Sequence, residues 1–176
     1  GVVVKQVPDT ATKIKINAGA SGIDTADIKW IVNPFDEFAI EAALQTKDKL
    51  GAGEVVVFSV GPERVKEAML TALAMGADRG VRITDPALDQ AGPLGVAKAL
   101  AAAIKANDVG LVFAGGRGVD DDMFAVPGML GELLGWATVN MAGEFALADN
   151  KESAIIKRKV AGGAVETVEV RLPALV

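Results

Sequence analysis

Residues 110–122 read GLVFAGGRGVDDD, and this stretch decides the fold that the sequence predicts. It begins with Gly110–Ala114, a short apolar run typical of strands that are buried on both faces. The glycine-rich segment Gly115–Gly118 follows, where backbone N–H groups can approach a ligand closely. Asp120–Asp122 then open an expected helix to about Leu134, with their carboxylates capping it and compensating its dipole. A strand, a glycine-rich loop and a helix in this order are typical of a parallel α/β sheet.

The residues before this stretch repeat the alternation of strand and helix. The expected strands are Val2–Val7, Glu54–Val60 and Gly80–Thr84. The first expected helix is Pro34–Lys49, with Asn33 as its N-cap, and the third is Pro93–Ala106. Between them, a helical segment has the expected buried stripe Val65, Met69, Ala72 and Met75. Lys13–Ile16 alternates strictly and is interpreted as one arm of a hairpin. Alternating β and α units imply right-handed crossovers, so the sequence predicts a three-layer α/β fold around a mainly parallel sheet.

From Thr138 onward the pattern changes to short strands joined by turns. The expected strands are Glu144–Leu147, Ser153–Lys159 and Val165–Arg171, with turns at Asp149-Asn150 and Gly162-Gly163. Such a succession predicts antiparallel strands in the C-terminal third of the chain. Because no linker or repeat interrupts the pattern, residues 1–176 are expected to form one domain.

Composition limits the chemistry that the chain can perform alone. It has 176 residues and a formal net charge of −5, with no cysteine, histidine or tyrosine. The commonest general base and the thiolate nucleophile are therefore missing, which favours binding a cofactor over catalysis by side chains. The acidic charge gives a nucleic-acid partner little support. No apolar run approaches the roughly 20 residues of a membrane span, and no secretory signal is visible.

Four segments should meet at the carboxyl edge of the predicted sheet: Val7–Thr10, Asn33–Asp36, Ser59–Pro62 and Gly115–Asp122. The helix start after the glycine-rich loop offers free N–H groups and a positive dipole end, which suit a phosphate. Neither a Walker sequence nor a dinucleotide fingerprint is present, so pattern alone gives a tight strand-to-helix turn about even odds. Three successive carboxylates diverge around a helix axis, which argues against one metal site.

Taken together, these segments resemble the electron transfer flavoprotein beta subunits over essentially the whole chain. The most specific match is Thr71–Gly80, which reads TALAMGADRG. Val4–Asp9 is similar to the family's first strand and loop, and Asn33–Glu37 is similar to the start of its first helix. Ile156–Pro173 resembles the family's C-terminal signature, although Ala161 stands where the family has an acidic residue.

This resemblance implies an adenine-nucleotide-binding, alpha-hydrolase-like fold and a heterodimer with an alpha subunit that holds most of an FAD. The beta subunit helps to bind this FAD and buries an AMP, or a second FAD in electron-bifurcating members. The pair takes electrons from flavoprotein dehydrogenases, such as the acyl-CoA dehydrogenases of fatty acid oxidation, and passes them to a quinone reductase or similar acceptor. The bacterial cytoplasm or mitochondrial matrix is the implied location. Relatives continue beyond Val176 into a partner-recognition loop and a C-terminal arm, so the chain is expected to be truncated before them.

Carried over residue by residue, the resemblance places the adenine near the backbone of Val3 and Val60, and Asp9, Thr10 and Phe35 toward the partner's flavin. The other implied cofactor-binding residues are Asn33, Pro34, Asp36, Gly115, Arg117, Asp120, Asp121, Asp122, Phe124, Ala125 and Val126. Two departures affect the phosphate. The family usually has Lys-Gln where Gly116-Arg117 stand, and polar side chains where Phe124–Val126 stand. Backbone amides are therefore expected to hold the phosphate, helped by Arg117, and AMP should bind more weakly than in relatives.

Two other functions fit the same kind of fold, because a fold does not fix a function. A regulatory module that binds an adenine nucleotide, resembling universal stress proteins, is disfavoured by the Thr71–Gly80 match. An ATP-cleaving ligase or sulfurtransferase would need a Ser/Gly-rich loop after the first strand. This chain has Val7-Pro8-Asp9 at that position.

Overall fold

A six-stranded sheet forms the centre of the computed structural model, which describes residues 1–89 and 91–176. Its strand order is β5-β4-β1-β6-β11-β7, and every neighbouring pair is parallel. The strands are β1 (Val2–Val3), β4 (Val56–Val60), β5 (Arg79–Ile83), β6 (Leu111–Ala114), β7 (Ala137–Thr138) and β11 (Ala174–Leu175). Val3 of β1 lies opposite Phe58 of β4 and Ala114 of β6, which confirms the predicted parallel core.

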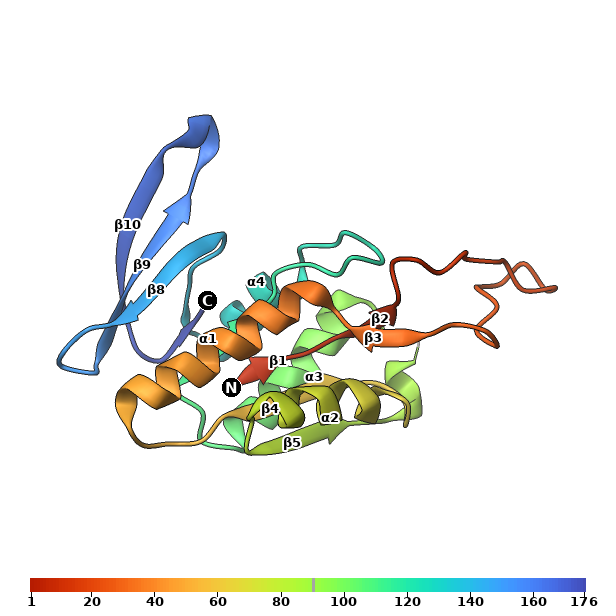
Figure 1. The fold of residues 1–176 in the computed structure, drawn as a ribbon, viewed down its shortest axis with the longest axis horizontal. Helices are drawn as coiled ribbons and strands as arrows, with labels where there is room; N and C mark the ends of the chain where they lie inside the picture. The colour runs from red at the N-terminus through yellow and green to blue at the C-terminus, as the bar shows by residue number, and fades with distance from the viewer. Residues whose placement is uncertain (90) are drawn as a thin grey trace.

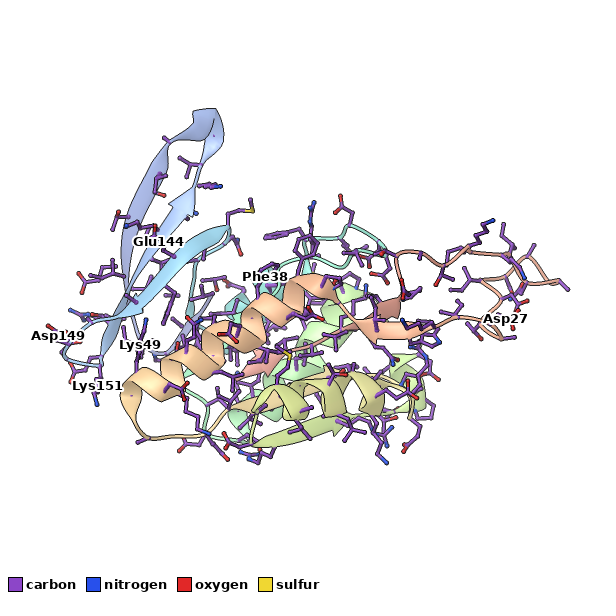
Figure 2. All side chains as sticks on the ribbon, viewed as in Figure 1. Asp27, Phe38, Lys49, Glu144, Asp149 and Lys151 are labelled. Atoms are coloured by element: carbon purple, nitrogen blue, oxygen red, sulfur yellow. The ribbon has the colours of Figure 1, made fainter. Side chains whose placement is uncertain are left out.

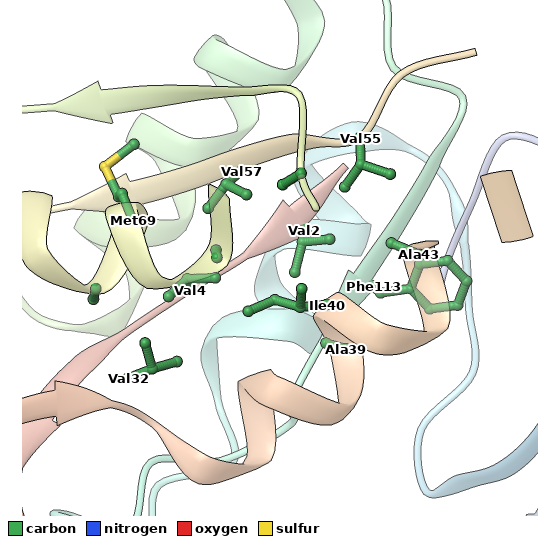
Figure 3. Close-up of a cluster of buried hydrophobic side chains, with 13 residues drawn as sticks. Val2, Val4, Val32, Ala39, Ile40, Ala43, Val55, Val57, Met69 and Phe113 are labelled. Atoms are coloured by element: carbon green, nitrogen blue, oxygen red, sulfur yellow. The ribbon is translucent and has the colours of Figure 1, made fainter. Parts of the chain in front are cut away.

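Two helices cover each face of this sheet (Figure 1). The helices are α1 (Pro34–Leu50), α2 (Val65–Met75), α3 (Pro93–Lys105) and α4 (Val126–Leu134), with short 3-10 turns η1 (Pro86–Leu88) and η2 (Ala161–Gly163). Successive side chains of β4 alternate between the faces. Val57 packs in a cluster with Ile40 of α1 and Met69 of α2 (Figure 3), whereas Phe58 packs in a cluster with Leu100 of α3. This alternation builds the predicted three-layer fold.

An antiparallel sheet projects from this body, as the C-terminal pattern predicted (Figure 1). It has the order β10-β9-β8, formed by β8 (Ala142–Leu147), β9 (Ser153–Lys159) and β10 (Val165–Arg171). Gly162 and Gly163 have φ of 79° and 80°, a left-handed conformation that favours glycine at the β9–β10 turn. The inner face packs Ala154, Ile156 and Val170 into a third cluster of buried side chains.

The first predicted strand is divided in two. After β1 the chain leaves the central sheet, and β2 (Gln6–Pro8) pairs antiparallel with β3 (Trp30–Val32), which the sequence did not predict. The change of direction occurs at Lys5, whose N–H donates to the Asp36 carboxylate at 2.7 Å instead of to a strand.

The predicted hairpin arm at Lys13–Ile16 does not form a regular strand, although Ile16 pairs antiparallel with Ile23. Among the described residues, its strand pairing is limited to this one isolated bridge, within an arm that projects between β2 and β3 (Figure 1). Ile14 and Ile16 are 52% and 75% exposed, so the alternating apolar side chains do not pack against a buried surface.

The predicted helix start at Asp120–Asp122 is also wrong. These residues form a turn, Asp122 has a φ of 52°, and α4 begins only at Val126 with Pro127 in its first turn. The carboxylates do not cap the helix because they pair with Lys5 and Arg117. On α2, a smaller correction is that Met75 is 39% exposed and falls outside the buried stripe.

Candidate functional site

The carboxyl ends of β1 and β6 mark the point where the chain changes direction across the sheet. From β1 the chain continues to β4 and β5 on one side, and then returns through α3 to β6 on the other side. In open α/β sheets, ligands bind in the crevice at such a switch point. The segment Gly115–Ala125, here called the β6 loop, follows β6 at this switch point and ends where α4 begins. The place between the carboxyl ends of β1 and β6 is here called the crevice.

Asn33 fixes the β6 loop to the start of α1. Its side chain is 1% exposed; Nδ2 donates to the Arg117 carbonyl oxygen at 2.9 Å, and Oδ1 accepts from the Val119 N–H at 3.2 Å. Asn33 stands at the N-cap position of α1 but makes no side-chain cap bond, so the predicted capping role is wrong. The side chain bonds to the loop instead, and Pro34 occupies the first turn of the helix.

Asp36 and Gly115 make the closest approach between α1 and the loop. A Cβ on Gly115 would lie 2.5 Å from the Phe35 carbonyl carbon and 2.6 Å from the Asp36 nitrogen, so only glycine fits. Burial raises the pKa of Asp36 to about 7, although hydrogen bonds from the Lys5 backbone, the Asn33 side chain and the Gly115 backbone favour its charged form. The Asp36 carboxyl therefore titrates near neutral pH.

Lys5 is a site residue that sequence reasoning missed. Its ammonium donates to Asp120 Oδ1 at 2.7 Å and to Asp121 Oδ2 at 2.9 Å, and its carbonyl oxygen accepts from the Asn33 N–H at 2.9 Å. Partial burial lowers the pKa of Lys5, but the hydrogen bonds with Asp120 and Asp121 outweigh it and raise the pKa above its ordinary value. The available signal was a charged residue directly after the apolar run Gly1–Val4.

Arg117 faces α1 across the loop. Its Cζ lies 4.8 Å from the centroid of the Phe35 ring, and its Nη1 pairs with Asp122 Oδ1 at 2.9 Å. A Cβ on Gly116 would lie 2.6 Å from Phe124 Cε2, so the Phe124 ring packs directly on the loop backbone. The structure thus brings together four residues that the resemblance implied as cofactor-binding: Phe35, Arg117, Asp122 and Phe124.

An open groove of about 1330 Å³ runs from these residues along α1 to the antiparallel sheet. Phe35, Arg117, Asp122 and Phe124 line one end of it. Figure 2 shows Phe38 and Lys49 on α1, with Glu144, Asp149 and Lys151 on the β8 side. The floor is largely apolar, including Ala39, Phe113 and Phe145, and charged side chains stand along its edges.

The start of α4 carries no side-chain cap. Ala125 occupies the N-cap position without a cap bond, and neither Phe124 nor Val126 has a polar side chain to supply one. Unpaired N–H groups at a helix start, with the positive end of its dipole, suit an anion. Val3, Val60 and Val126 all pack against the cluster on the α3–α4 face, so the implied adenine and phosphate positions share one side of the sheet.

Asp9 and Thr10 lie apart from this arrangement, at the beginning of the projecting arm. The Asp9 carboxylate accepts from the Ala11 N–H at 3.0 Å and pairs with Lys29 at 3.2 Å, and Thr10 is exposed. The base of this arm is held to α2 by Arg64, whose Cζ lies 3.5 Å from the centroid of the Trp30 ring. The implied placement of Asp9 and Thr10 toward a partner's flavin stays a prediction.

Within residues 1–89 and 91–176, no group of three or more acidic, histidine or cysteine side chains could hold a metal ion. None of the helices in this part of the chain is both long and apolar enough to cross a lipid bilayer.

The sequence matches a family model described as "Electron transfer flavoprotein domain" over residues 21–176. The chain is 38% identical over 175 residues to the mitochondrial electron transfer flavoprotein subunit beta of Arabidopsis thaliana, covering 99% of this chain and 68% of that protein. It is 40% identical over 178 residues to the mitochondrial subunit beta of Oryza sativa subsp. japonica, covering 99% and 69%. It is 38% identical over 175 residues to the subunit beta of Bradyrhizobium diazoefficiens, covering 99% and 68%. The chain therefore spans about two thirds of the length of these relatives.

Proposed function

Since the chain belongs to the family of electron transfer flavoprotein beta subunits, we propose that it forms a heterodimer with an alpha subunit and carries electrons as part of that pair. It helps the alpha subunit to bind FAD and supplies no catalytic side chain of its own. Flavoprotein dehydrogenases, such as those that oxidise acyl-CoA, donate the electrons, and a quinone reductase or similar acceptor takes them. The lack of histidine and cysteine supports this role, because electron transfer requires a positioned cofactor and no general base.

We further propose that the crevice between β1 and β6 binds an adenine nucleotide, with AMP preferred to a second FAD. One observation carries this proposal: the β6 loop is hydrogen-bonded to Asn33 at the switch point and leads directly to the start of α4, which has no side-chain cap. The residues present fit such a ligand. The adenine lies near the backbone of Val3 and Val60, and the phosphate meets the amides of Phe124–Val126. The helix dipole adds roughly half a positive unit charge there.

The nucleotide is tested by identifying what the protein carries. The chain is purified with its alpha subunit and denatured, and the released nucleotides are identified by mass spectrometry. One AMP and one FAD per heterodimer are expected. A calorimetric titration of nucleotide-free protein that shows no binding of AMP, ADP or FAD would remove the site.

The subunit role is tested with the chain alone. It should neither hold a flavin tightly nor pass electrons unaided. A yellow, isolated chain with stoichiometric FAD that transfers electrons without a partner would contradict the heterodimer. If the crevice takes a second FAD, the isolated chain is coloured but still inactive.

A further inference from the structure

Lys5 connects three separate parts of the crevice. Its N–H donates to Asp36 Oδ2 at 2.7 Å, and its carbonyl oxygen accepts from the Asn33 N–H at 2.9 Å, so its backbone is fixed to α1. Its ammonium reaches across the crevice to Asp120 and Asp121, which are 115 and 116 residues away in sequence. Lys5 follows β1, and the two aspartates follow β6.

The ammonium also lies directly over the loop backbone. A Cβ on Gly118 would lie 2.8 Å from Lys5 Nζ and 3.0 Å from Asp121 Oδ1. The loop is therefore held from both sides. The Asn33 side chain binds the backbone of Arg117 and Val119, while Lys5 binds the aspartates that follow.

Lys5 has no other ion-pair partner within the described residues, and the two aspartates likewise pair only with Lys5. Met123 N–H donates to Asp121 Oδ1 at 3.0 Å, so the ion pairs extend to the residue before Phe124. From there it is three residues to Val126, where α4 begins, and the amides of Phe124–Val126 at this helix start form the proposed phosphate site. A shift of Asp120 and Asp121 would consequently move the approach to that helix.

We propose that Lys5 is a positioning residue: its ion pairs with Asp120 and Asp121 close the crevice between β1 and β6 and hold the β6 loop in the shape that receives a nucleotide phosphate. This inference rests on the proposed nucleotide site and assigns to Lys5 a role in it without direct contact with the ligand. The phosphate depends on the loop, whereas the adenosine part depends on β1 and β4. Lys5 therefore affects AMP far more than adenosine.

Three variants distinguish positioning of the β6 loop by Lys5 from simple attraction between the Lys5 charge and the phosphate. Lys5→Met removes the ion pairs, and Lys5→Arg keeps a cation in reach of both carboxylates. The triple variant Lys5→Met, Asp120→Asn, Asp121→Asn removes the ion pairs but leaves the loop less negative than in the wild type. The matched control is Lys66→Met on α2, which removes an exposed ion pair with Glu63, away from the loop.

Affinities for AMP and adenosine are measured by calorimetry on nucleotide-free heterodimer. For Lys5→Met and for the triple variant, AMP binding should weaken about fivefold or more and adenosine binding less than twofold, as expected for two partly exposed charged contacts. Lys5→Arg and Lys66→Met should stay within about twofold of the wild type for both ligands. Wild-type AMP affinity in the triple variant would overturn the proposal, because charge alone would then explain the effect of Lys5.

Hydrogen exchange of the ligand-free protein gives a readout that does not depend on nucleotide binding. The amides of Val119 and Asp122, which bond to Asn33 Oδ1 and to the Gly118 carbonyl oxygen, should exchange several times faster in Lys5→Met than in the wild type. Unchanged exchange would also overturn the proposal. If the wild type binds neither AMP nor adenosine, the nucleotide site itself fails, and exchange still decides whether Lys5 holds the loop.

Discussion

The side chain of Asn33 donates a 2.9 Å hydrogen bond to the carbonyl oxygen of Arg117, a residue 84 positions later in the chain. This bond joins the first residue before α1 to the β6 loop. Together with the bond from Val119, it gives the Nδ2 and the Oδ1 of this buried side chain one partner each in the loop. Several properties of the crevice depend on this contact and on its neighbours.

Asn33→Ala should lower the free energy of unfolding by about 2 kcal/mol, because it removes two hydrogen bonds and leaves partly buried backbone groups unpaired. Urea denaturation followed by circular dichroism measures the change. Gln45→Ala, at an exposed position of α1, is the control and should change stability by less than about 0.5 kcal/mol. Equal effects of the two substitutions would contradict a special role for Asn33.

The Asp36 carboxyl predicts how stability depends on pH. Its pKa in the folded protein is about 7, above the ordinary value of 3.8, so the folded state binds this proton more tightly than the unfolded state does. The resulting stability is present below about pH 4 and is lost as the pH rises through about 7. Between pH 5.5 and 8 this single group should lower the free energy of unfolding by about 2 kcal/mol. Asp36→Asn should flatten this part of the profile in urea denaturation, and an identical slope in both proteins would show that the carboxyl does not titrate there.

Gly115→Ala should be strongly destabilising, by about 2–4 kcal/mol, because the new methyl group overlaps the backbone at Phe35 and Asp36. Gly128→Ala is the matched control. A Cβ at Gly128 meets no atom within 4 Å, and alanine is favoured over glycine inside a helix, so this variant should gain about 0.5–1 kcal/mol. Thermal unfolding distinguishes the two, and a tolerated Gly115→Ala would mean that α1 and the loop are farther apart in solution.

Ser59 offers a stabilising substitution. Its hydroxyl is the one buried side-chain polar atom without a hydrogen-bond partner in the part of the chain that is described. Ser59→Ala should therefore leave the free energy of unfolding unchanged or raise it by up to about 1 kcal/mol. In Ser153→Ala the lost hydroxyl is also buried but donates to Glu169 at 2.9 Å, so stability should fall by about 1 kcal/mol. A loss of stability in Ser59→Ala would indicate a partner, such as a bound water.

Arg117 tests how the phosphate is held. Its guanidinium pairs with Asp122, so an incoming phosphate competes with that carboxylate. Arg117→Ala should weaken AMP binding about three- to tenfold, and Asp122→Asn should strengthen it by freeing the guanidinium. Calorimetric titration measures both, with adenosine as the ligand that should not respond. If the Arg117→Ala protein binds AMP like the wild type, Arg117 lines the groove but does not contact the phosphate.

Much of the fold was accessible from the sequence because it depends on local pattern. Gly110–Ala114 and Val165–Arg171 are strands within one residue of their predicted bounds, since continuous apolar runs and paired glycines are local signals. The two-residue strands β7 and β11 were missed, because a strand so short has no periodicity and exists only through its neighbours.

The candidate site shows the same division. The sequence predicted that the segments containing Asn33 and Gly115 would meet at one edge of the sheet, and the structure brings them together there. Their role in binding a cofactor stays a prediction. The roles of the charged residues were not accessible, since Asp120 looks like a helix cap until Lys5, 115 residues earlier, is placed beside it. The contact is long-range, so no window of sequence contains it.

The position of β11 has a consequence for how the protein is made. Ala174 and Leu175 insert between β6 and β7 and pair with both, although they follow the whole antiparallel sheet in sequence. During synthesis on the ribosome, one edge of β6 therefore stays unpaired until β11 has been made. β7 has no strand partner until more than thirty further residues have been added. Contacts with such large sequence separation slow folding, and open strand edges attract other chains. Nascent chains should thus depend on chaperones most while the residues between β7 and β11 emerge.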